Sequence, residues 1–321
     1  MNSTPDDQTQ PSKRQRADDG QAITLYAPPE ENVDQNVDAG LRTSSLADPT
    51  MKLSGHKGSV YCIAYDPQGD LLCSGSFDTT CLLWKAGGNC ENVAVLSGHK
   101  NAILDCRFTN DSEKVIAASA DNNLGVFDVA TGERLKRFMG HSSIVNAVDV
   151  SSEASPALAV SASDDCTVKL WDARVRGETG SLEDEYQITA VAYSNDGNSV
   201  YSLSINPKGT HILSNSMDGT IRSWDIRPFI EDNKKRHHKT FVGGTHNSEK
   251  GLLNCSWNSD GTMVTGGSAD RIVHIWDELS AEELYVLPGH AGCVNSVVFH
   301  PKENVVASAS SDKSIYVGEL S

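Results

Sequence analysis

Serine, histidine and aspartate recur together along this chain, and that combination of side chains can form a nucleophilic catalytic triad. A serine stands two residues before an aspartate in six places, for example Ser76 before Asp78. A histidine precedes its aspartate by 22 or 24 residues, as His56 precedes Asp78 and His141 precedes Asp165. A catalytic site needs one such set, whereas this set recurs at fixed spacing. The repetition therefore favours a structural role and disfavours catalysis.

A tryptophan follows most of these aspartates by six residues, as Trp84 follows Asp78. Phe127 replaces the tryptophan in the second copy, and Gly318 replaces it in an imperfect sixth copy. The steps between these positions are 43, 44, 53, 52 and 42 residues. A period near 43 residues, bounded by Gly-His and Trp-Asp, is typical of a repeated unit of four strands. Short β-rich runs such as residues 60–65 and 71–76, separated by a turn, agree with this unit.

From residue 54 onward the pattern resembles the WD-repeat family. The resemblance implies an all-β WD40 β-propeller in which residues 46–53 supply the outer strand of the last blade. It also implies that histidine, serine, aspartate and tryptophan form a hydrogen-bonded staple within each blade, because buried polar groups are costly unless paired. The expected staple residues are His56, Ser76, Asp78, Trp84, His99, Asp121, His141, Asp165, Trp171, Asp218, Trp224, His246, Asp270, Trp276, His290 and Asp312.

One repeat is incomplete. Two first-strand patterns follow each other between Trp171 and Trp224, at residues 188–193 and 200–205, without an Asp turn, Trp or Gly-His between them. Two full repeats would need about 33 more residues here. We therefore expect six complete blades plus a remnant first strand of a seventh, with the gap near 198/199, arising from a splice variant or a gene-model error. Residues 186–198 should then form a displaced strand or loop, and stability should be reduced.

The composition limits the classes of partner. Lys plus Arg number 27 and Asp plus Glu 43, giving a formal charge of −16. Such a surface repels phosphate backbones, so we expect no direct nucleic-acid binding. Without an apolar run of about 18 residues, the chain is expected to be soluble and to have no membrane partner. The eight cysteines form no C-x-x-C pair, and we expect no metal, cofactor or small-molecule ligand.

The ends and loops give weaker signals. Residues 1–45 are polar and are expected to form a disordered tail, and residues 46–321 to form the propeller. The basic cluster 13–16 is a candidate nuclear-import signal or a solvated run. The basic part of the insertion at 228–239 fits a solvated loop, or contact with an acidic partner or RNA.

A binding face follows from the family architecture. In propellers the Asp turns and the Gly-His loops lie on the same, narrower face. Side chains just before each aspartate, or near the start of each first strand, should line its central opening. The candidates from the turns are Phe77, Asp164, Met217 and Ser311, and those from the strands are Tyr61, Leu104, Asn146, Tyr201, Asn254 and Asn295. For Tyr61 and Phe77, packing between blades is an equally good interpretation.

Longer stretches, such as residues 213–229 and 287–292, resemble WD-repeat subunits of the U5 small nuclear ribonucleoprotein of the spliceosome. This resemblance implies a nuclear, non-catalytic scaffold for pre-mRNA splicing, a monomer within a large complex that contacts large scaffold and helicase or GTPase subunits. The alternative is a substrate adaptor of a cullin-type ubiquitin ligase, since residues 171–174 and 224–227 both match a W-D-x-R box. An enzyme is disfavoured, because no unrepeated acid–base pair is present.

Overall fold

The computed structural model describes residues 44–151, 158–193, 200–201, 204–228, 236–246 and 251–320. Every regular element within these ranges is a β-strand. Consequently, the described part of the chain holds no helix that could cross a membrane. Residues 43–321 form one compact unit.

Six antiparallel sheets of four strands each, here called blades, follow one another along the described chain. Short runs rich in Val, Ile, Leu and aromatic residues form the strands, and Gly, Asp and Asn turns connect them. The first three blades consist of β2 (Val60–Tyr65), β3 (Leu71–Ser76), β4 (Cys81–Lys85) and β5 (Asn92–Leu96); β6 (Ile103–Phe108), β7 (Lys114–Ser119), β8 (Asn123–Asp128) and β9 (Arg134–Met139); and β10 (Val145–Val150), β11 (Leu158–Ser163), β12 (Thr167–Asp172) and β13 (Glu178–Glu183).

The last three blades have the same order of strands, from the innermost to the outermost. They consist of β16 (Ser204–Ile205), β17 (His211–Asn215), β18 (Ile221–Asp225) and β19 (His237–Phe241); β20 (Cys255–Trp257), β21 (Met263–Gly266), β22 (Ile272–Asp277) and β23 (Glu283–Pro288); and β24 (Val294–Phe299), β25 (Val305–Ser310), β26 (Ser314–Glu319) and β1 (Thr50–Ser54).

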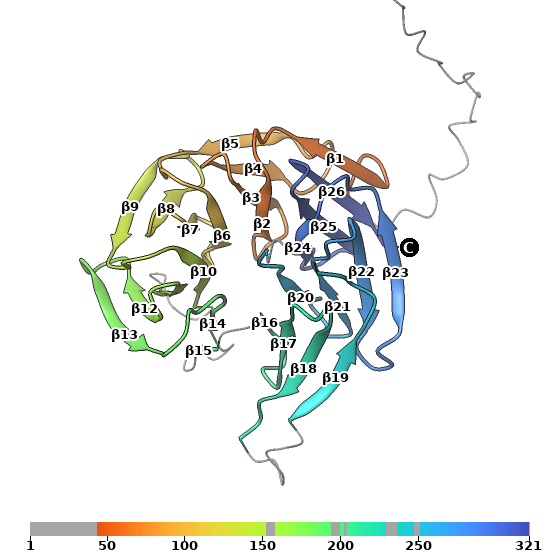
Figure 1. The fold of residues 1–321 in the computed structure, drawn as a ribbon. Coiled ribbons are helices and arrows are strands. Elements are labelled where there is room, and N and C mark those ends of the chain that lie inside the picture. Colours follow the sequence, from red (N-terminus) through yellow and green to blue (C-terminus); the bar gives the residue numbers. More distant parts are fainter. Residues whose placement is uncertain are drawn as a thin grey trace, which may run out of the picture. The chain divides into compact units, whose positions relative to one another are not determined.

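The first strand of the chain closes the last blade. β1 pairs antiparallel with β26, with Thr50 opposite Gly318 and Ser54 opposite Ser314. In Figure 1 the two ends of the propeller therefore meet in one sheet, while the other blades are arranged around a common centre. Closure by the N-terminal strand, as the family resemblance implied, removes two strand edges that would otherwise be exposed.

The core lies between neighbouring blades. Strand residues alternate between the two faces of a sheet, so each blade has one face toward the preceding blade and one toward the following blade. On the first blade, Leu72 and Trp84 pack with Val305 of the last blade. Cys73 and Leu83, from the opposite face, pack with Phe127 of the second blade. Each complete blade therefore needs a neighbour on both sides to bury its apolar side chains.

A two-stranded element lies between the third and fourth blades, where the sequence predicts an incomplete repeat. β14 (Ala192–Tyr193) pairs antiparallel with β15 (Val200–Tyr201). Ile188, Val191 and Tyr193 pack against the apolar face of the third blade. The segment thus occupies the position of a first strand. Its derivation from a seventh blade remains a prediction.

Candidate protein-interaction face

A hydrogen-bonded chain joins four side chains of the first blade. His56 lies in the loop after β1, and its Nδ1 is 3.0 Å from Asp78 Oδ2. Its Nε2 is 2.8 Å from Ser74 Oγ. The indole Nε1–H of Trp84 donates to the same hydroxyl at 3.0 Å. Because the carboxylate can only accept, the imidazole donates from Nδ1 and accepts the Ser74 proton at Nε2. The loop, the turn and two strands are thereby fastened together.

Electrostatics keep this network in one protonation state. Burial lowers the pKa of His56, and this effect outweighs the neighbouring carboxylate, which raises it. Burial opposes ionisation of Asp78, but hydrogen bonds from Thr80, the Lys57 amide and His56 lower its pKa to about 2. A neutral imidazole beside an ionised carboxylate is therefore the stable arrangement near neutral pH.

The third blade repeats the network in full, with Trp171 Nε1 donating to Ser161 at 2.8 Å. The last blade has it without the tryptophan, which is Gly318, and the second blade has part of it. His141 contacts Asp165 at 2.8 Å and Ser161 at 2.6 Å. His290 contacts Asp312 at 3.1 Å and Ser308 at 2.9 Å. In the second blade, His99 Nδ1 is 3.0 Å from Asp121, while its buried Nε2 has no partner among the described residues, because Ala117 replaces the serine. These sets stabilise blades, and their polar atoms are used within the fold.

The prediction of Ser76 as the staple serine was wrong in position. The hydroxyl that contacts histidine and tryptophan belongs to Ser74, two residues earlier. Ser76 Oγ instead accepts the backbone N–H of Asp78 at 3.1 Å. Both serines point to the same face of β3, since side chains repeat every two residues. Ser76 is the last residue of β3 and lies beside the turn, whereas Ser74 lies two residues earlier, within reach of the Trp84 indole.

The prediction for His246 was also wrong. Gly243 has φ of 138°, like the glycine before His99, so the residue in the histidine position is Gly244. His274 on β22 supplies the imidazole that contacts the turn aspartate instead. Its Nε2 is 2.9 Å from Asp270 Oδ2, and its Nδ1 is hydrogen-bonded to Glu283. Trp276 Nε1 donates to the carbonyl of Val242 at 3.0 Å. This blade keeps a staple built from different residues, with Gly266 at the serine position.

The fourth blade has its own variant, because no Gly-His loop precedes it in the sequence. Asp218 Oδ2 is 2.6 Å from the Arg222 guanidinium. Trp224 Nε1 donates to Ser214 Oγ at 2.8 Å. An ion pair thus replaces the imidazole, while the tryptophan–serine contact is kept.

Two residues predicted to lie on the binding face, Phe77 and Met217, are largely exposed. Phe77 is 60% exposed and Met217 is 59% exposed, each on the turn directly before its aspartate. These turns adjoin the loops between blades, since the amide of Phe77 donates to the carbonyl of Ser59 at 2.9 Å. Large apolar side chains in such positions are the usual anchors of protein interfaces. Tyr61, Leu104, Asp164 and Ser311 are only partly exposed.

Asn146 and Asn295, two other predicted face residues, are buried at 7% and 5% exposure, which corrects their assignment to the face. Asn295 Nδ2 donates to the carbonyl of Val60 on the next blade at 2.7 Å. Asn146 makes the same link to Ile188 in the remnant segment, at 3.0 Å. These amides join successive first strands, so their hydrogen bonds serve the fold. The side chain of Tyr201, a further candidate, lies outside the described residues.

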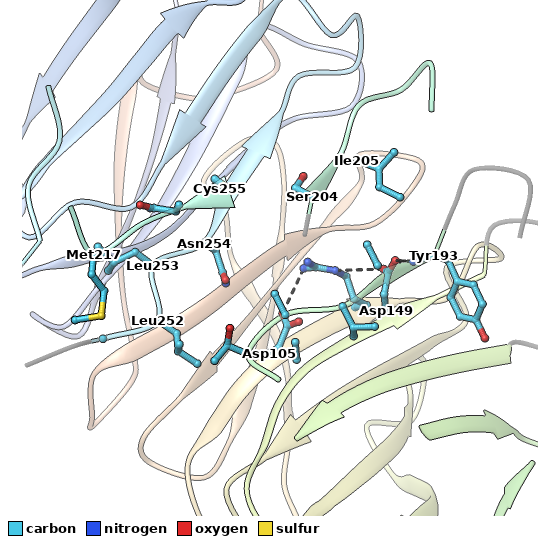
Figure 2. Close-up of a pocket in the computed structure, with 18 of the residues that line it drawn as sticks. Asp105, Asp149, Tyr193, Ser204, Ile205, Met217, Leu252, Leu253, Asn254 and Cys255 are labelled. Carbon is cyan, nitrogen blue, oxygen red and sulfur yellow. Dashed lines mark hydrogen bonds and ion pairs between the residues drawn. The ribbon is translucent and has the colours of Figure 1, made fainter. Parts of the chain in front are cut away.

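A central cavity of about 490 Å³ opens beside the remnant segment (Figure 2). Met217 and Asn254, both predicted face residues, line it. Leu252, Leu253 and His246 also line it, and Leu252 is exposed. Sequence reasoning missed these leucines, because the loop before β20 does not follow the repeat spacing. The cavity therefore connects the exposed face with the centre of the propeller.

An ionic cluster in this cavity was also missed. Arg107 is 3.4 Å from Asp105 and 3.6 Å from Asp149, as Figure 2 marks with dashed lines. Burial raises the pKa of Asp105 to about 6, although Arg107 opposes this shift. Burial likewise raises the pKa of Asp149. Both carboxylates also accept backbone amides, from Val148 and Tyr193 respectively. The cluster joins the first strands of the second and third blades to the remnant.

Comparisons with known proteins agree with this architecture. The WD domain, G-beta repeat model matches residues 47–85, and the Nucleolar protein 10-like, N-terminal domain model matches residues 100–321. The fold and these matches define a WD-repeat β-propeller. The chain is 42% identical over 309 residues to the U5 small nuclear ribonucleoprotein 40 kDa protein of Homo sapiens, covering 87% of this chain and 86% of that one. It belongs to the family of these 40 kDa proteins.

Other relatives support the same placement. The Dictyostelium discoideum protein with this name is 38% identical over 322 residues, again covering 87% of this chain and 86% of the relative. Pre-mRNA-splicing factor cwf17 of Schizosaccharomyces pombe is 35% identical over 309 residues, covering 87% of this chain and 90% of the relative.

Proposed function

We propose that this chain is a non-catalytic scaffold of the U5 particle that takes part in pre-mRNA splicing in the nucleus. The observation that carries the proposal is the similarity, across 87% of the chain, to proteins named as a U5 component and a splicing factor. The use of the repeated Ser, His and Asp groups inside the blades supports a scaffold, since those polar atoms already satisfy one another.

The narrower face, with Phe77 and Met217 at its centre, is the proposed binding surface. Both side chains and Leu252 are exposed, and Met217 and Leu252 also line the central cavity. Partly exposed Tyr61, Leu104, Asp164, Asn254 and Ser311 would form the surrounding contacts. Apolar anchors encircled by polar groups give the energetic pattern expected of a protein interface.

The partners are proposed to be spliceosomal proteins, namely large scaffold and helicase or GTPase subunits of the U5 particle. The net charge of −16 supports protein partners over direct contact with RNA, because an acidic surface repels phosphate. Inside the particle we expect one copy of the chain.

The ubiquitin-ligase alternative is not favoured. In both W-D-x-R boxes the arginine folds back onto its own aspartate, with Arg174 2.6 Å from Asp172. Arg227 pairs with Asp225 in the same way. The similarity to splicing factors over most of both chains points away from an adaptor.

Affinity purification of the tagged chain from nuclear extract, followed by quantitative mass spectrometry, tests the function. Enrichment of U5 proteins over a control bait of equal charge is the expected result. Recovery of cullin and ligase subunits without splicing proteins would overturn the proposal in favour of the alternative. Treatment with ribonuclease before elution should leave the recovery unchanged if proteins make the contacts.

A further inference from the structure

The fourth blade has an uncovered face toward the remnant segment. In the first blade, Leu72, Ser74 and Trp84 lie on the face toward the preceding blade and are buried. The residues at the same register in the second, third and fifth blades are buried as well: Val115, Ala117, Phe127, Ala159, Ser161, Trp171, Val264, Gly266 and Trp276. In the fourth blade, Ile212, Ser214 and Trp224 are only partly buried. We call Ile212, Ser214, Arg222 and Trp224 the fourth-blade face.

The third blade has an uncovered face on the other side of the remnant. Leu182 on β13 is 59% exposed. The residues at its register in the other blades are less exposed: Leu53, Leu96, Phe138 and Phe241 are buried, and Leu287 is partly buried. The remnant covers the inner part of the third blade through Ile188, Val191 and Tyr193, in a cluster that Leu170 joins at its edge. We call Leu170 and Leu182, with the adjoining acidic residues 183–185, the third-blade face.

These two faces are complementary by position. At three complete junctions, the residue at the Leu182 register meets the aromatic residue at the Trp224 register of the following blade. Phe138 stacks on Trp171 with ring centroids 5.2 Å apart, and Phe241 packs against Trp276 at 6.2 Å. Leu96 and Phe127 share one core cluster. The natural counterpart of Leu182 is therefore the tryptophan at position 224.

Leu182 and Trp224 do not cover each other within one chain, since the first is largely exposed and the second only partly buried. In Figure 1 the labelled strands β14 and β15 lie between the third blade and β16–β18. The two faces also differ in charge. Residues 183–185 (Glu, Asp, Glu) are exposed beside Leu182, whereas on the fourth-blade face the Arg222 guanidinium beside Trp224 is paired with Asp218.

We propose that the isolated chain associates with a second copy of itself, with the third-blade face of one copy packing on the fourth-blade face of the other. This contact reproduces a junction between blades in trans. It replaces, for the isolated chain, the expectation of a monomer. Because the two faces differ, the interface is heterologous, and a dimer leaves one face of each kind open. The inference does not depend on the proposed role in splicing.

Sedimentation velocity of the purified chain, from about 1 to 100 µM, tests this inference. We expect concentration-dependent dimers and larger species. Leu182→Glu on one face, and Ile212→Glu on the other, should each weaken self-association at least about tenfold. Leu135→Glu, at a similarly exposed leucine on the outer strand of the complete second blade, is the matched control and should associate like the wild type.

Mixing the two variants gives the most specific test of the proposed pairing of faces. An equimolar mixture of Leu182→Glu and Ile212→Glu keeps one intact pair of complementary faces, so it should form dimers but nothing larger. If circular dichroism shows that Ile212→Glu is unfolded, the milder polar change Ile212→Asn takes its place. A wild type that stays monomeric throughout, self-association that Leu182→Glu leaves unchanged, or a mixture without dimers would each overturn the inference.

Discussion

His56 Nε2 lies 2.8 Å from Ser74 Oγ, and the same hydroxyl accepts the indole N–H of Trp84 at 3.0 Å. Ser74 is therefore the centre of the first staple, with two buried side chains depending on one oxygen. Ser76, the other serine on the same side of β3, bonds only to the backbone N–H of Asp78. The two hydroxyls should thus contribute unequally to stability.

Ser74→Ala should destabilise the fold by about 1–3 kcal/mol, because it leaves buried polar atoms of His56 and Trp84 without partners. Ser76→Ala should cost less, since it removes a single hydrogen bond. His56→Ala and His290→Ala should each cost about 1–3 kcal/mol for the same reason as Ser74→Ala. Urea denaturation with circular dichroism measures all four. Equal stability of Ser74→Ala and the wild type would contradict the stabilising role that we assign to the staple.

The fifth blade offers an internal comparison between two histidines. His274→Ala should lower the free energy of unfolding by about 1–3 kcal/mol, because it deprives Asp270 and Glu283 of a shared partner. His246→Ala should cost less, since Gly244 stands at the position that histidine occupies in other blades. Thermal denaturation of both variants at neutral pH measures the difference. A larger loss for His246→Ala would contradict our assignment of the staple in this blade.

Acid should weaken the fold below about pH 6.5, the ordinary pKa of histidine. Burial lowers the pKa of His56, His99, His141 and His290 in the folded state. The folded chain then binds fewer protons than the unfolded chain, so this stability is present above pH 6.5 and is lost as the pH falls. Asp105 and Asp149, whose pKa values burial raises, act in the opposite direction.

A variant comparison separates these contributions. His56→Gln/His290→Gln removes two of these four staple imidazoles, so its stability should fall less steeply between pH 7 and pH 5 than that of the wild type. Urea midpoints at several pH values measure the slopes. An identical slope in the variant would show that these histidines do not carry the pH dependence. Below about pH 4, protonation of Asp78, Asp165 and Asp312, with pKa values of about 2, should add a further loss.

The sequence predicted the blades, because the repeat period, the Asp turns and the apolar alternation all reflect the same local geometry, and the family resemblance implied their closure. It misplaced Ser76 because a serine before aspartate recurs in all six copies, whereas Ser74 has equivalents only in some. Strand periodicity alone cannot distinguish two serines on one face. His246 was misassigned because it lies two residues after the histidine position of the loop, which Gly244 occupies.

Some residues of the predicted face are exposed, and their role in binding remains a proposal. Position within a turn indicates exposure, so Phe77 and Met217 could be identified from the repeat. Position near the start of a first strand does not indicate exposure, because contact with the neighbouring blade determines whether the side chain is buried. Asn146 and Asn295 are buried through their links to the adjacent strand. The cluster of Arg107 with Asp105 and Asp149 brings together residues of two blades, and no spacing in the sequence reports it.

The exposed face is the central element of the proposed function, and Phe77→Ala/Met217→Ala tests it most directly. Both side chains project from turns, so their truncation should leave the thermal stability within about 0.5 kcal/mol of the wild type. Leu135→Ala/Leu279→Ala removes two exposed leucines elsewhere and serves as the control. The measurement is the amount of U5 proteins that each tagged chain recovers from nuclear extract. We predict a loss of at least about tenfold for Phe77→Ala/Met217→Ala and full recovery for the control. Full recovery of splicing proteins by Phe77→Ala/Met217→Ala would contradict the account.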